Sequence, residues 1–293
     1  MITISNVYKS FGKNSVLSGV GMTIEEGSLV AVVGPSGTGK SVLLKLITGM
    51  LEVDSGTISI DGHVVTGHGE LASQTPNSIV TRFCENTHLG VLNSVFRKNV
   101  QPRTWGFSRI PNNKAEREMV AQEMGVLFQA AALFDSMTLF ENVSFPLEQR
   151  RKLSSKEIQE RSLQYLHDVG LKGYEDKLPG EISIGMRKRV GIARALITEP
   201  KYLFFDEPNT GLDPEMGQGI YELIIKMHAR YGFTGIVISH EIPEIFQVCQ
   251  RVIMLYNGQV QIDGTVEEFL ACNNPVVRQF IKGAAEGPIQ LNF

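Results

Sequence analysis

The feature that most constrains this chain is the segment Gly34-Pro-Ser-Gly-Thr-Gly-Lys-Ser41, which matches the pattern G-x-x-x-x-G-K-[ST] at every fixed position. The apolar run Leu29–Val33 before it has the length and composition of a buried strand. The run Ser41–Thr48 after it is helical in pattern, and Gly49 is a natural C-terminal stop. A strand, a Gly-rich turn and a helix in this order are expected to open a parallel α/β core.

The Gly-rich turn predicts a phosphate-binding loop. Glycines allow the backbone to curl so that its N–H groups point inward, and the helix N-terminus adds a partial positive charge at the same place. Lys40 is expected to reach the β- and γ-phosphates of a nucleotide, and the hydroxyl of Ser41 to bind Mg²⁺. A Gly-rich turn with a chance lysine is the alternative, which the flanking strand and helix disfavour. The expected nucleotide contacts at this loop are Gly34, Pro35, Ser36, Gly37, Thr38, Gly39, Lys40, Ser41 and Val42.

A second motif is the apolar run Tyr202–Phe205 followed by Asp206 and Glu207. Two adjacent acids at the end of a buried strand are costly unless something uses them. Asp206 is expected to hold Mg²⁺ through its water shell, and Glu207 to polarise an attacking water. A strand that only surfaces in acidic residues is the alternative if this motif stood alone. Together the two motifs indicate a P-loop nucleoside triphosphatase.

Composition narrows the class of protein. Hydrophobic residues make up 42% and charged residues 20%, and the formal net charge of −3 offers no basic field for nucleic acid. The three cysteines, Cys84, Cys249 and Cys272, are far apart, which indicates a reduced compartment and argues against a disulfide scaffold or a zinc site. The first residues lack a signal-peptide pattern, and the apolar runs are too short to cross a bilayer. Any membrane-spanning part is therefore expected in another chain.

The order of expected elements divides the chain. Three β-rich runs near the start are Thr3–Val7, Gly19–Ile24 and Thr57–Ile60. The last ends in the hairpin signal Asp61-Gly62, and the three predict an antiparallel β subdomain. A helical subdomain is expected at about 130–200, and later strands alternate with helices, so the expected fold class is α/β. A Ser/Thr/Asn/Gly-rich stretch at about 67–112 is too long for a plain connection and is expected to be an insertion.

Three helix starts carry capping signals. Ser154-x-x-Glu157 and Thr265-x-x-Glu268 are capping boxes. Asp213 followed by Pro214 supplies an N-cap and an N1 proline. Helices are therefore expected to begin at these three places.

Further motifs resemble those of the ABC ATPases. Residues Glu181–Met186 and the following run Arg187–Leu196 resemble the ABC signature and its helix, and they precede Asp206-Glu207-Pro208 by the short spacing of that family. Shorter motifs resemble the D-loop, the Q-loop, the switch histidine and the adenine-stacking aromatic residue, and these are Gly211-Leu-Asp213, Gln129, His240 and Phe11. The resemblance covers nearly all of residues 1–265 outside the insertion.

The resemblance implies an ABC ATPase domain over residues 1–265 that binds ATP and Mg²⁺. In this family the signature of one copy closes on the ATP held by the P-loop of the other, so a homodimer around two ATP is expected. The implied catalytic residues are Glu207, His240, Lys40 and Gln129, and the implied metal-site residues are Ser41, Gln129 and Asp206. Beyond the phosphate loop, the implied nucleotide contacts are Phe11, Ser183, Gly185, Met186 and Asp213. Tyr8 is the alternative to Phe11 as the aromatic residue.

One residue departs from the family pattern. The usual signature has Ser-Gly-Gly, and Ile184 stands at the first glycine. A β-branched side chain does not comfortably adopt the positive φ that glycine permits, and it adds bulk where two copies and a nucleotide meet. ATP binding is expected to be intact, and hydrolysis to be retained but slowed.

Other segments resemble the ATPases of Mla/Mce phospholipid-transport systems, and these are Gly39–Lys45, Leu127–Ser136, Glu141–Leu147, Leu178–Glu181, Val277–Gly283 and Gly287–Ile289. This implies a complex with an integral-membrane permease dimer, an MCE-domain lipid carrier and sometimes a STAS-domain subunit, without nucleic acid. The chain would lie peripherally on the cytoplasmic face of the inner membrane and drive phospholipid transport between envelope membranes. Residues 266–293 are expected to form a C-terminal helix and a docking tail.

Alternatives stay open. The chain could be an ABC ATPase for another substrate, or a weakly hydrolysing regulatory ABC protein, an interpretation that rests on Ile184. An ABC protein of translation or DNA repair is disfavoured by the single phosphate loop and by a sequence without sustained heptads or a basic stripe. The insertion is either an adapter surface built on aromatic and basic residues, such as Trp105 and Arg103, or a solvated excursion.

Overall fold

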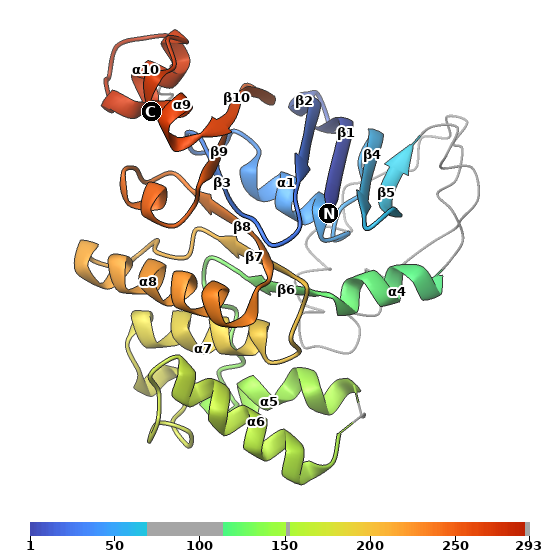
Figure 1. The fold of residues 1–293 in the computed structure, drawn as a ribbon, viewed down its shortest axis with the longest axis vertical. Helices are drawn as coiled ribbons and strands as arrows, with labels where there is room; N and C mark the ends of the chain where they lie inside the picture. The colour runs from blue at the N-terminus through green and yellow to red at the C-terminus, as the bar shows by residue number, and fades with distance from the viewer. Residues whose placement is uncertain (69–113, 151–152, 291–293) are drawn as a thin grey trace. The chain divides into compact units, whose positions relative to one another are not determined.

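The computed structural model describes residues 1–68, 114–150 and 153–290, and Figure 1 labels its elements. Its contacts divide the chain into two compact units. The first comprises Met1–Ile24, Ser41–Ala121 and Asn257–Gln259, and the second comprises Glu25–Lys40, Gln122–Tyr256 and Val260–Phe293. Within the described ranges, no helix has the length and apolar character needed to cross a membrane.

The first unit is built on an antiparallel sheet with the strand order β2-β1-β4-β5. Its elements are β1 (Ile2–Phe11), β2 (Asn14–Ile24), β4 (Ser55–Ile60), β5 (His63–His68), most of α1 (Lys40–Ile47) and α4 (Lys114–Gln122). Ile2 lies opposite Ile60 and Ile4 opposite Ile58, and all four side chains are buried. This alternation of buried residues is what the sequence predicted for an antiparallel sheet with one covered face.

The hairpin between β4 and β5 is confirmed. Asp61 and Gly62 both have positive φ, 50° and 82°, which is the backbone of a two-residue hairpin turn. β5 continues past the expected start of the insertion, because Gly67 still pairs with Thr57. The insertion therefore begins after β5, and the expectations for residues 69–113 lie outside the described residues.

The second unit contains a six-stranded sheet with the order β10-β9-β3-β8-β7-β6. The strands are β3 (Leu29–Val33), β6 (Met124–Leu127), β7 (Tyr202–Asp206), β8 (Thr234–Ser239), β9 (Arg251–Tyr256) and β10 (Gln259–Thr265). β3 pairs in parallel with β8 and β9, and β7 pairs in parallel with β6 and β8. β3, β7 and β8 are buried along their whole length, as expected of strands covered on both faces. The predicted α/β class with an antiparallel β subdomain is confirmed.

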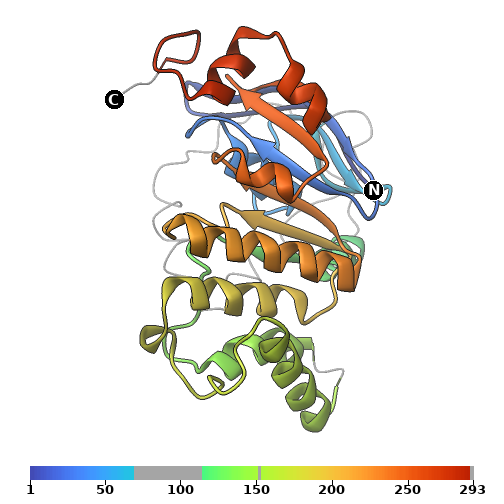
Figure 2. The same cartoon turned by 60° about the vertical axis from the view of Figure 1, so that its left-hand side comes forward.

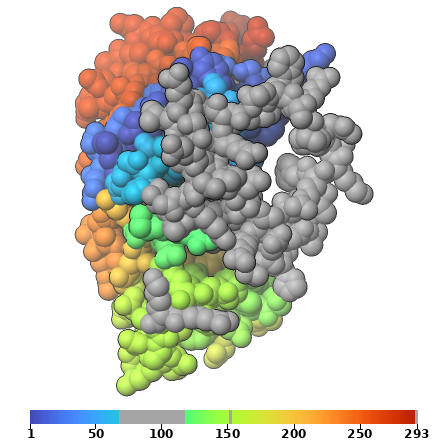
Figure 3. Space-filling view, turned by 90° about the vertical axis from the view of Figure 1, so that its right-hand side faces the viewer, coloured from blue at the N-terminus to red at the C-terminus, as the bar shows by residue number. Residues whose placement is uncertain are grey.

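Helices, some of them short 3-10 turns, make up the rest of the second unit. They are α5 (Leu139–Arg150), α6 (Ser155–Asp168), η3 (Pro179–Glu181), α7 (Ile184–Leu196), α8 (Pro214–Tyr231), η4 (Glu244–Gln247), α9 (Val266–Ala271) and α10 (Pro275–Lys282). In Figures 1 and 2, α8 runs along the sheet, α7 runs beside α8, and α5 and α6 lie on the far side of α7. The space-filling view shows the side chains of α5 and α6 as a contiguous group in lime green (Figure 3). The capping boxes of α6 and α9 and the Asp213 cap of α8 are all formed.

The tail folds back onto its own unit. Ile289 is 6% exposed and belongs to the apolar core. The side-chain amide of Gln279, on α10, accepts from the Ile289 N–H at 2.6 Å and donates to the Ile289 carbonyl at 3.1 Å. The Tyr256 hydroxyl donates to the carbonyl of Pro288 at 2.8 Å. This chain therefore covers Ile289 itself, and the docking role of residues 266–293 stays a prediction.

Candidate functional site

The phosphate loop follows β3 directly, and glycine is required at its first position. Gly34 has a φ of +146°, and a Cβ there would lie 2.2 Å from the main-chain oxygen of Leu255. That approach is close because β3 and β9 are paired neighbours in the sheet. Gly37 and Gly39 also have positive φ, 79° and 96°. The backbone curl that the sequence predicts is present at all three positions.

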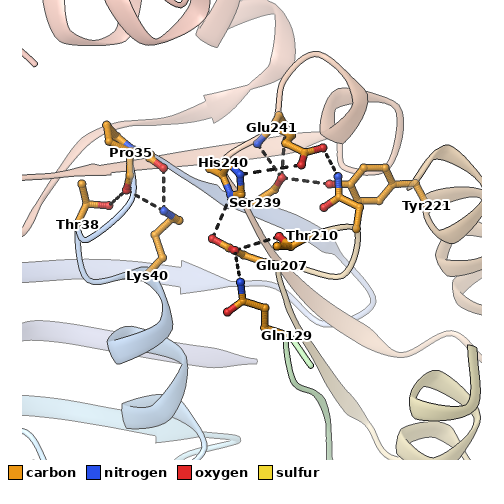
Figure 4. Close-up of polar contacts among 12 residues, drawn as sticks. Pro35, Thr38, Lys40, Gln129, Glu207, Thr210, Tyr221, Ser239, His240 and Glu241 are labelled. Carbon is orange, nitrogen blue, oxygen red and sulfur yellow. Dashed lines mark hydrogen bonds and ion pairs between the residues drawn. The ribbon is translucent and has the colours of Figure 1, made fainter. Parts of the chain in front are cut away.

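Lys40 is buried at the end of this loop. Its side chain is 4% exposed, and its Nζ donates to the carbonyls of Gly34 at 2.7 Å and Pro35 at 2.8 Å. The Thr38 hydroxyl donates to the same Pro35 carbonyl at 2.9 Å (Figure 4). Burial lowers the pKa of Lys40, and the negative charges of Glu207 and, more weakly, Asp206 partly counter that shift. The ammonium group of Lys40 is thus hydrogen-bonded to main-chain carbonyls, which a phosphate oxygen could replace as its partner. Ser41 and Val42 follow as the second and third residues of α1.

Glu207 lies just past the end of β7, and three side chains converge on its carboxylate (Figure 4). Gln129 Nε2 donates to Oε2 at 3.0 Å, and Thr210 Oγ1 donates to the same oxygen at 3.1 Å. His240 Nδ1 lies 3.1 Å from Oε1. The backbone of Glu207 is left-handed, with a φ of 47°, a strained conformation typical of functional sites. The structure therefore brings together Gln129, Glu207 and His240, as the sequence predicted from three distant motifs.

A buried lysine lies beneath this group. Lys188, on α7, is 2% exposed, and its Nζ donates to the main-chain carbonyls of Gln129 and, at 3.3 Å, Glu207. Burial lowers the pKa of Lys188, and the charges of Glu207 and Asp206 oppose that shift. Sequence reasoning did not assign this residue. The signal that was available is the position of this lysine on the face of α7 whose other buried residues are apolar or glycine.

A second hydrogen-bond network holds the segment around His240. Asn209 is 4% exposed, and its amide donates to the carboxylate of Glu241. The Glu241 N–H donates to Ser239 Oγ at 3.0 Å, and that hydroxyl lies 3.1 Å from the hydroxyl of Tyr221 on α8. Figure 4 shows His240 between this network and Glu207. The side-chain amide of Asn209 is thus matched to a carboxylate that it can reach.

The Asn209–Glu241 contact gives a testable prediction for His240. We expect Asn209→Thr and Glu241→Gln each to lower kcat, because either change weakens the hydrogen bond that holds the chain segment around His240. Since the two side chains act through one contact, the double variant should lose less than the sum, with a coupling of about 0.5–3 kcal/mol in activation free energy. A double-mutant cycle on ATP hydrolysis measures this. Additive losses would show that the contact does not position His240.

The signature segment begins α7. Ser183 is the N-cap, and its hydroxyl accepts from the Met186 N–H at 3.2 Å. A Cβ on Gly185 would meet its nearest neighbour, Met216 Sδ, at 3.6 Å, which is ordinary contact. This chain alone would therefore accept alanine at position 185. If glycine is needed there, the reason lies in a partner or ligand.

The expected reason for slowed hydrolysis needs correction. Ile184 is the first helical residue of α7, and it is not among the described residues with positive φ. The backbone therefore does not require glycine at this position. Its side chain is 51% exposed, so only the bulk of the side chain remains as a cause.

We therefore expect Ile184→Ala and Ile184→Gly to raise the turnover of the assembled complex to a similar extent. A change on the order of threefold corresponds to about 0.65 kcal/mol of activation free energy. Glycine also loses more backbone freedom on folding than alanine does, so the alanine variant should be the more stable. Steady-state ATPase rates and thermal unfolding check both statements. A gain with glycine alone would show that backbone freedom matters instead.

All the implied nucleotide contacts stay predictions, and Asp213 and Phe11 are two of them. The carboxylate of Asp213 caps α8, accepting from the Met216 N–H at 2.9 Å, and its side chain is otherwise exposed. Phe11 belongs to the first unit, at the end of β1, with 49% of its surface exposed. The Lys9 ammonium lies 5.5 Å from the centre of its ring. Tyr8, the alternative aromatic residue, is 41% exposed.

Comparison with known proteins identifies the class. The sequence profile of the family described as ABC transporter matches residues 17–210, which is more than half of the chain. The chain therefore belongs to the ABC transporter family, and it carries the ATP-binding, ATP-hydrolysing domain of that family.

Individual relatives extend over the whole chain. Protein TRIGALACTOSYLDIACYLGLYCEROL 3, chloroplastic, from Arabidopsis thaliana is 35% identical, with 99% of this chain and 76% of that protein covered. The probable ribonucleotide transport ATP-binding protein mkl of Mycobacterium tuberculosis is 35% identical, with 99% and 69% covered. The intermembrane phospholipid transport system ATP-binding protein MlaF of Escherichia coli is 28% identical, with 100% and 93% covered.

Solved structures agree with the fold. The ATP-binding cassette MJ0796, described as a dimer in a post-hydrolysis state with ADP and Pi, aligns with a TM-score of 0.68 at 25% identity. The alignment covers 91% of this chain and 99% of that chain. The protein cbiO1 from Clostridium perfringens, part of an ABC transporter complex, aligns with a TM-score of 0.70 at 26% identity. It covers 92% of this chain and 90% of that chain.

Proposed function

We propose that two copies of this chain close around two ATP molecules and drive a separate membrane permease that moves phospholipid between envelope membranes. The observation that carries the enzymatic part is the carboxylate of Glu207, held by three side chains from separate segments within electrostatic reach of Lys40. The dimer is supported by the dimeric state described for the similar cassette MJ0796.

The proposed reaction is attack of water on the γ-phosphorus of ATP, which breaks the bond to the β–γ bridging oxygen and releases ADP and phosphate. Glu207 orients the water and accepts its proton, and its hydrogen bonds from Gln129 and Thr210 fix the direction of the carboxylate. Lys40 stabilises negative charge on the transferring phosphoryl group. Ser183 and Gly185 of the second copy would complete the site. His240, beside Glu207, would contact the γ-phosphate.

The oxygen-bearing side chains of this site fit Mg²⁺, a cation that takes oxygen ligands. Ser41, Asp206 and Gln129 are the residues that would hold it. Asp206 is 8% exposed at the end of β7, where a buried carboxylate needs positive partners. When bound, Mg²⁺ would offset the charge of the phosphate oxygens.

The proposal of phospholipid as the transported molecule is supported by the names of two similar proteins. MlaF, which is named for intermembrane phospholipid transport, matches this chain over 93% of its own length. The Arabidopsis relative is named for a galactolipid. The expected partners are therefore a permease dimer and an MCE-domain lipid carrier, with a STAS-domain subunit as a further candidate. The place of the chain would be the cytoplasmic face of the inner membrane.

The test is to purify the tagged chain from its native membranes in mild detergent and to identify the accompanying proteins and lipids. An untagged strain is the control for unspecific binding. Copurification of a permease, an MCE-domain protein and phospholipid supports the proposal. A different permease would keep the transport function and remove the phospholipid cargo, and ribosomal or DNA-repair proteins would remove both.

A second candidate is transport of another cargo. The observation that favours it is the mycobacterial relative, named for ribonucleotide transport and 35% identical to this chain. Stimulation of ATP hydrolysis in the purified complex distinguishes the two candidate cargoes, phospholipid and ribonucleotide. Stimulation by phospholipid vesicles but not by ribonucleotides favours the lipid, and the reverse result favours this candidate.

A further inference from the structure

Helix α7 connects two places that ATP would use. Its N-cap is Ser183, the signature serine, and five residues later Lys188 contacts the carbonyls of Gln129 and Glu207. At 1.5 Å of rise per residue, the two positions are about 7.5 Å apart along the helix axis. In a dimer of the proposed kind, Ser183 faces the ATP of the second copy, whereas Glu207 serves the ATP of its own copy.

Three successive positions on one face of α7 hold the segment 129–132. Lys188 donates to the carbonyl of Gln129. Gly191 lies against this segment so closely that a Cβ would be 2.5 Å from Leu127 Cδ1 and 3.3 Å from Ala131 Cβ. Arg194 donates from Nη2 to the carbonyl of Ala131 at 2.6 Å and from Nη1 to the next carbonyl, of residue 132, at 2.8 Å. The spacing of three residues places all three contacts on the same side of the helix.

The backbone that α7 holds is strained. Ala131 and Ala132 have left-handed φ values of 59° and 46°, and Glu207 has a φ of 47°. Residues with a Cβ keep such a conformation only where their surroundings fix it. The carbonyls that Lys188 and Arg194 bind belong to these residues and to Gln129, so α7 supplies part of that fixation.

α7 is also well fixed along its length. Its buried residues are Gly185, Lys188, Val190, Gly191, Ile192, Ala193, Ala195 and Leu196. A close-packed helix moves as a body rather than deforming between neighbouring turns. A shift at the N-cap would therefore be passed on to Lys188 and to the carbonyls that it binds.

We propose that engagement of Ser183 by the ATP of a second copy sets the positions of Gln129 and Glu207 through α7, with Lys188 as the positioning residue. The two ATP sites of a dimer are then linked inside each copy by one helix. This inference rests on the proposed dimer. Its signature is cooperative hydrolysis, because each site becomes competent when the other is occupied.

The main test is Lys188→Met, which keeps the length of the side chain and removes the donor and the charge. In the complex purified with its membrane partners, we expect kcat to fall about tenfold to a hundredfold, since a small misplacement of catalytic groups has effects of this size. The Hill coefficient for ATP should fall from above one to one, while the affinity of the full chain for ATP is unchanged. This split between kcat and ATP affinity is not expected from a general loss of stability.

The matched control is Arg189→Met. Arg189 is the next residue of the same helix, carries the same charge, and donates to the carbonyl of Val169 at 3.0 Å. It should leave the Hill coefficient and kcat unchanged. Wild-type kcat and cooperativity in Lys188→Met, or a Hill coefficient of one in the wild type, would overturn the inference.

Two measurements keep the test decisive. If Lys188→Met does not fold, hydrogen exchange of segment 129–132 is followed in the Glu207→Gln chain with and without ATP. Unchanged exchange on formation of dimers would overturn the coupling, whereas reduced exchange supports it. If the Glu207→Gln chain stays monomeric with saturating ATP, the proposed dimer is wrong. If dimers form but the hydrogen exchange of segment 129–132 does not change, the dimer stands and only the coupling through α7 is wrong.

Discussion

Replacing Glu207 with glutamine is expected to lower kcat for ATP hydrolysis by about 10²–10⁴-fold, the range usual for loss of a general base. The amide keeps the shape of the side chain and can still accept from Gln129 or Thr210, which bind the carboxylate at 3.0 and 3.1 Å. The affinity for ATP should therefore be retained. Since ATP binds but is not consumed, the chain should accumulate as an ATP-bound dimer.

Two measurements check this expectation. Single-turnover hydrolysis gives the rate of the chemical step, and light scattering with size-exclusion chromatography gives the oligomeric state with saturating ATP. Glu215→Gln is a matched control, because Glu215 is an exposed glutamate in the first turn of α8. A Glu207→Gln chain that hydrolyses ATP at the normal rate would remove Glu207 from the mechanism.

The second large effect is expected for Gly34→Ala. The new Cβ would lie 2.2 Å from the Leu255 oxygen and 3.2 Å from Thr38 Oγ1, and the residue would also keep an unfavourable φ. Because Leu255 belongs to β9, which pairs with β3, relief requires a shift of a central strand. We expect a loss of about 4 kcal/mol in the free energy of unfolding, the size reserved for severe steric change, and loss of ATP binding.

Gly37→Ala distinguishes two causes of the stability loss expected for Gly34→Ala: the steric clash of the new Cβ and the unfavourable positive φ. Gly37 also has a positive φ, 79°, but a Cβ there meets nothing within 4 Å. Its substitution should cost only the left-handed backbone, about 1–2 kcal/mol. Thermal unfolding of both variants gives the comparison. Equal losses would show that contact with Leu255 is not the reason for glycine at position 34.

Local rules explain what the sequence could predict. The phosphate loop, the hairpin at Asp61-Gly62 and the helix caps at Ser154, Asp213 and Thr265 each depend on residues a few positions apart. The buried runs of β3 and β7 were visible because a parallel strand covered on both faces is continuously apolar. The meeting of Gln129, Glu207 and His240 followed from family resemblance rather than from such rules.

What the sequence did not reveal depends on distant partners. Lys188 reaches Gln129 across 59 residues, and Asn209 reaches Glu241 across 32. A contact between residues so far apart in the sequence produces no periodic pattern from which it could be predicted. The expectation that position 184 needs the positive φ of glycine was wrong, because a Gly-Gly pattern does not reveal which φ its first glycine adopts. The structure shows that this position is helical.

The attachment of the tail has a consequence for how the chain can be handled. The amide of Gln279 offers Ile289 one acceptor and one donor, as a neighbouring peptide group in a sheet would. The link carries no net charge, so neither salt nor moderate changes of pH weaken it in the way they weaken an ion pair. High-salt washing, which strips loosely held proteins from membranes, should therefore leave this part of the chain folded. Gln279→Glu would instead place a carboxyl group against the Ile289 carbonyl. The tail should then be released as the pH rises through the pKa of that carboxyl, because its ionised form can no longer donate to the carbonyl.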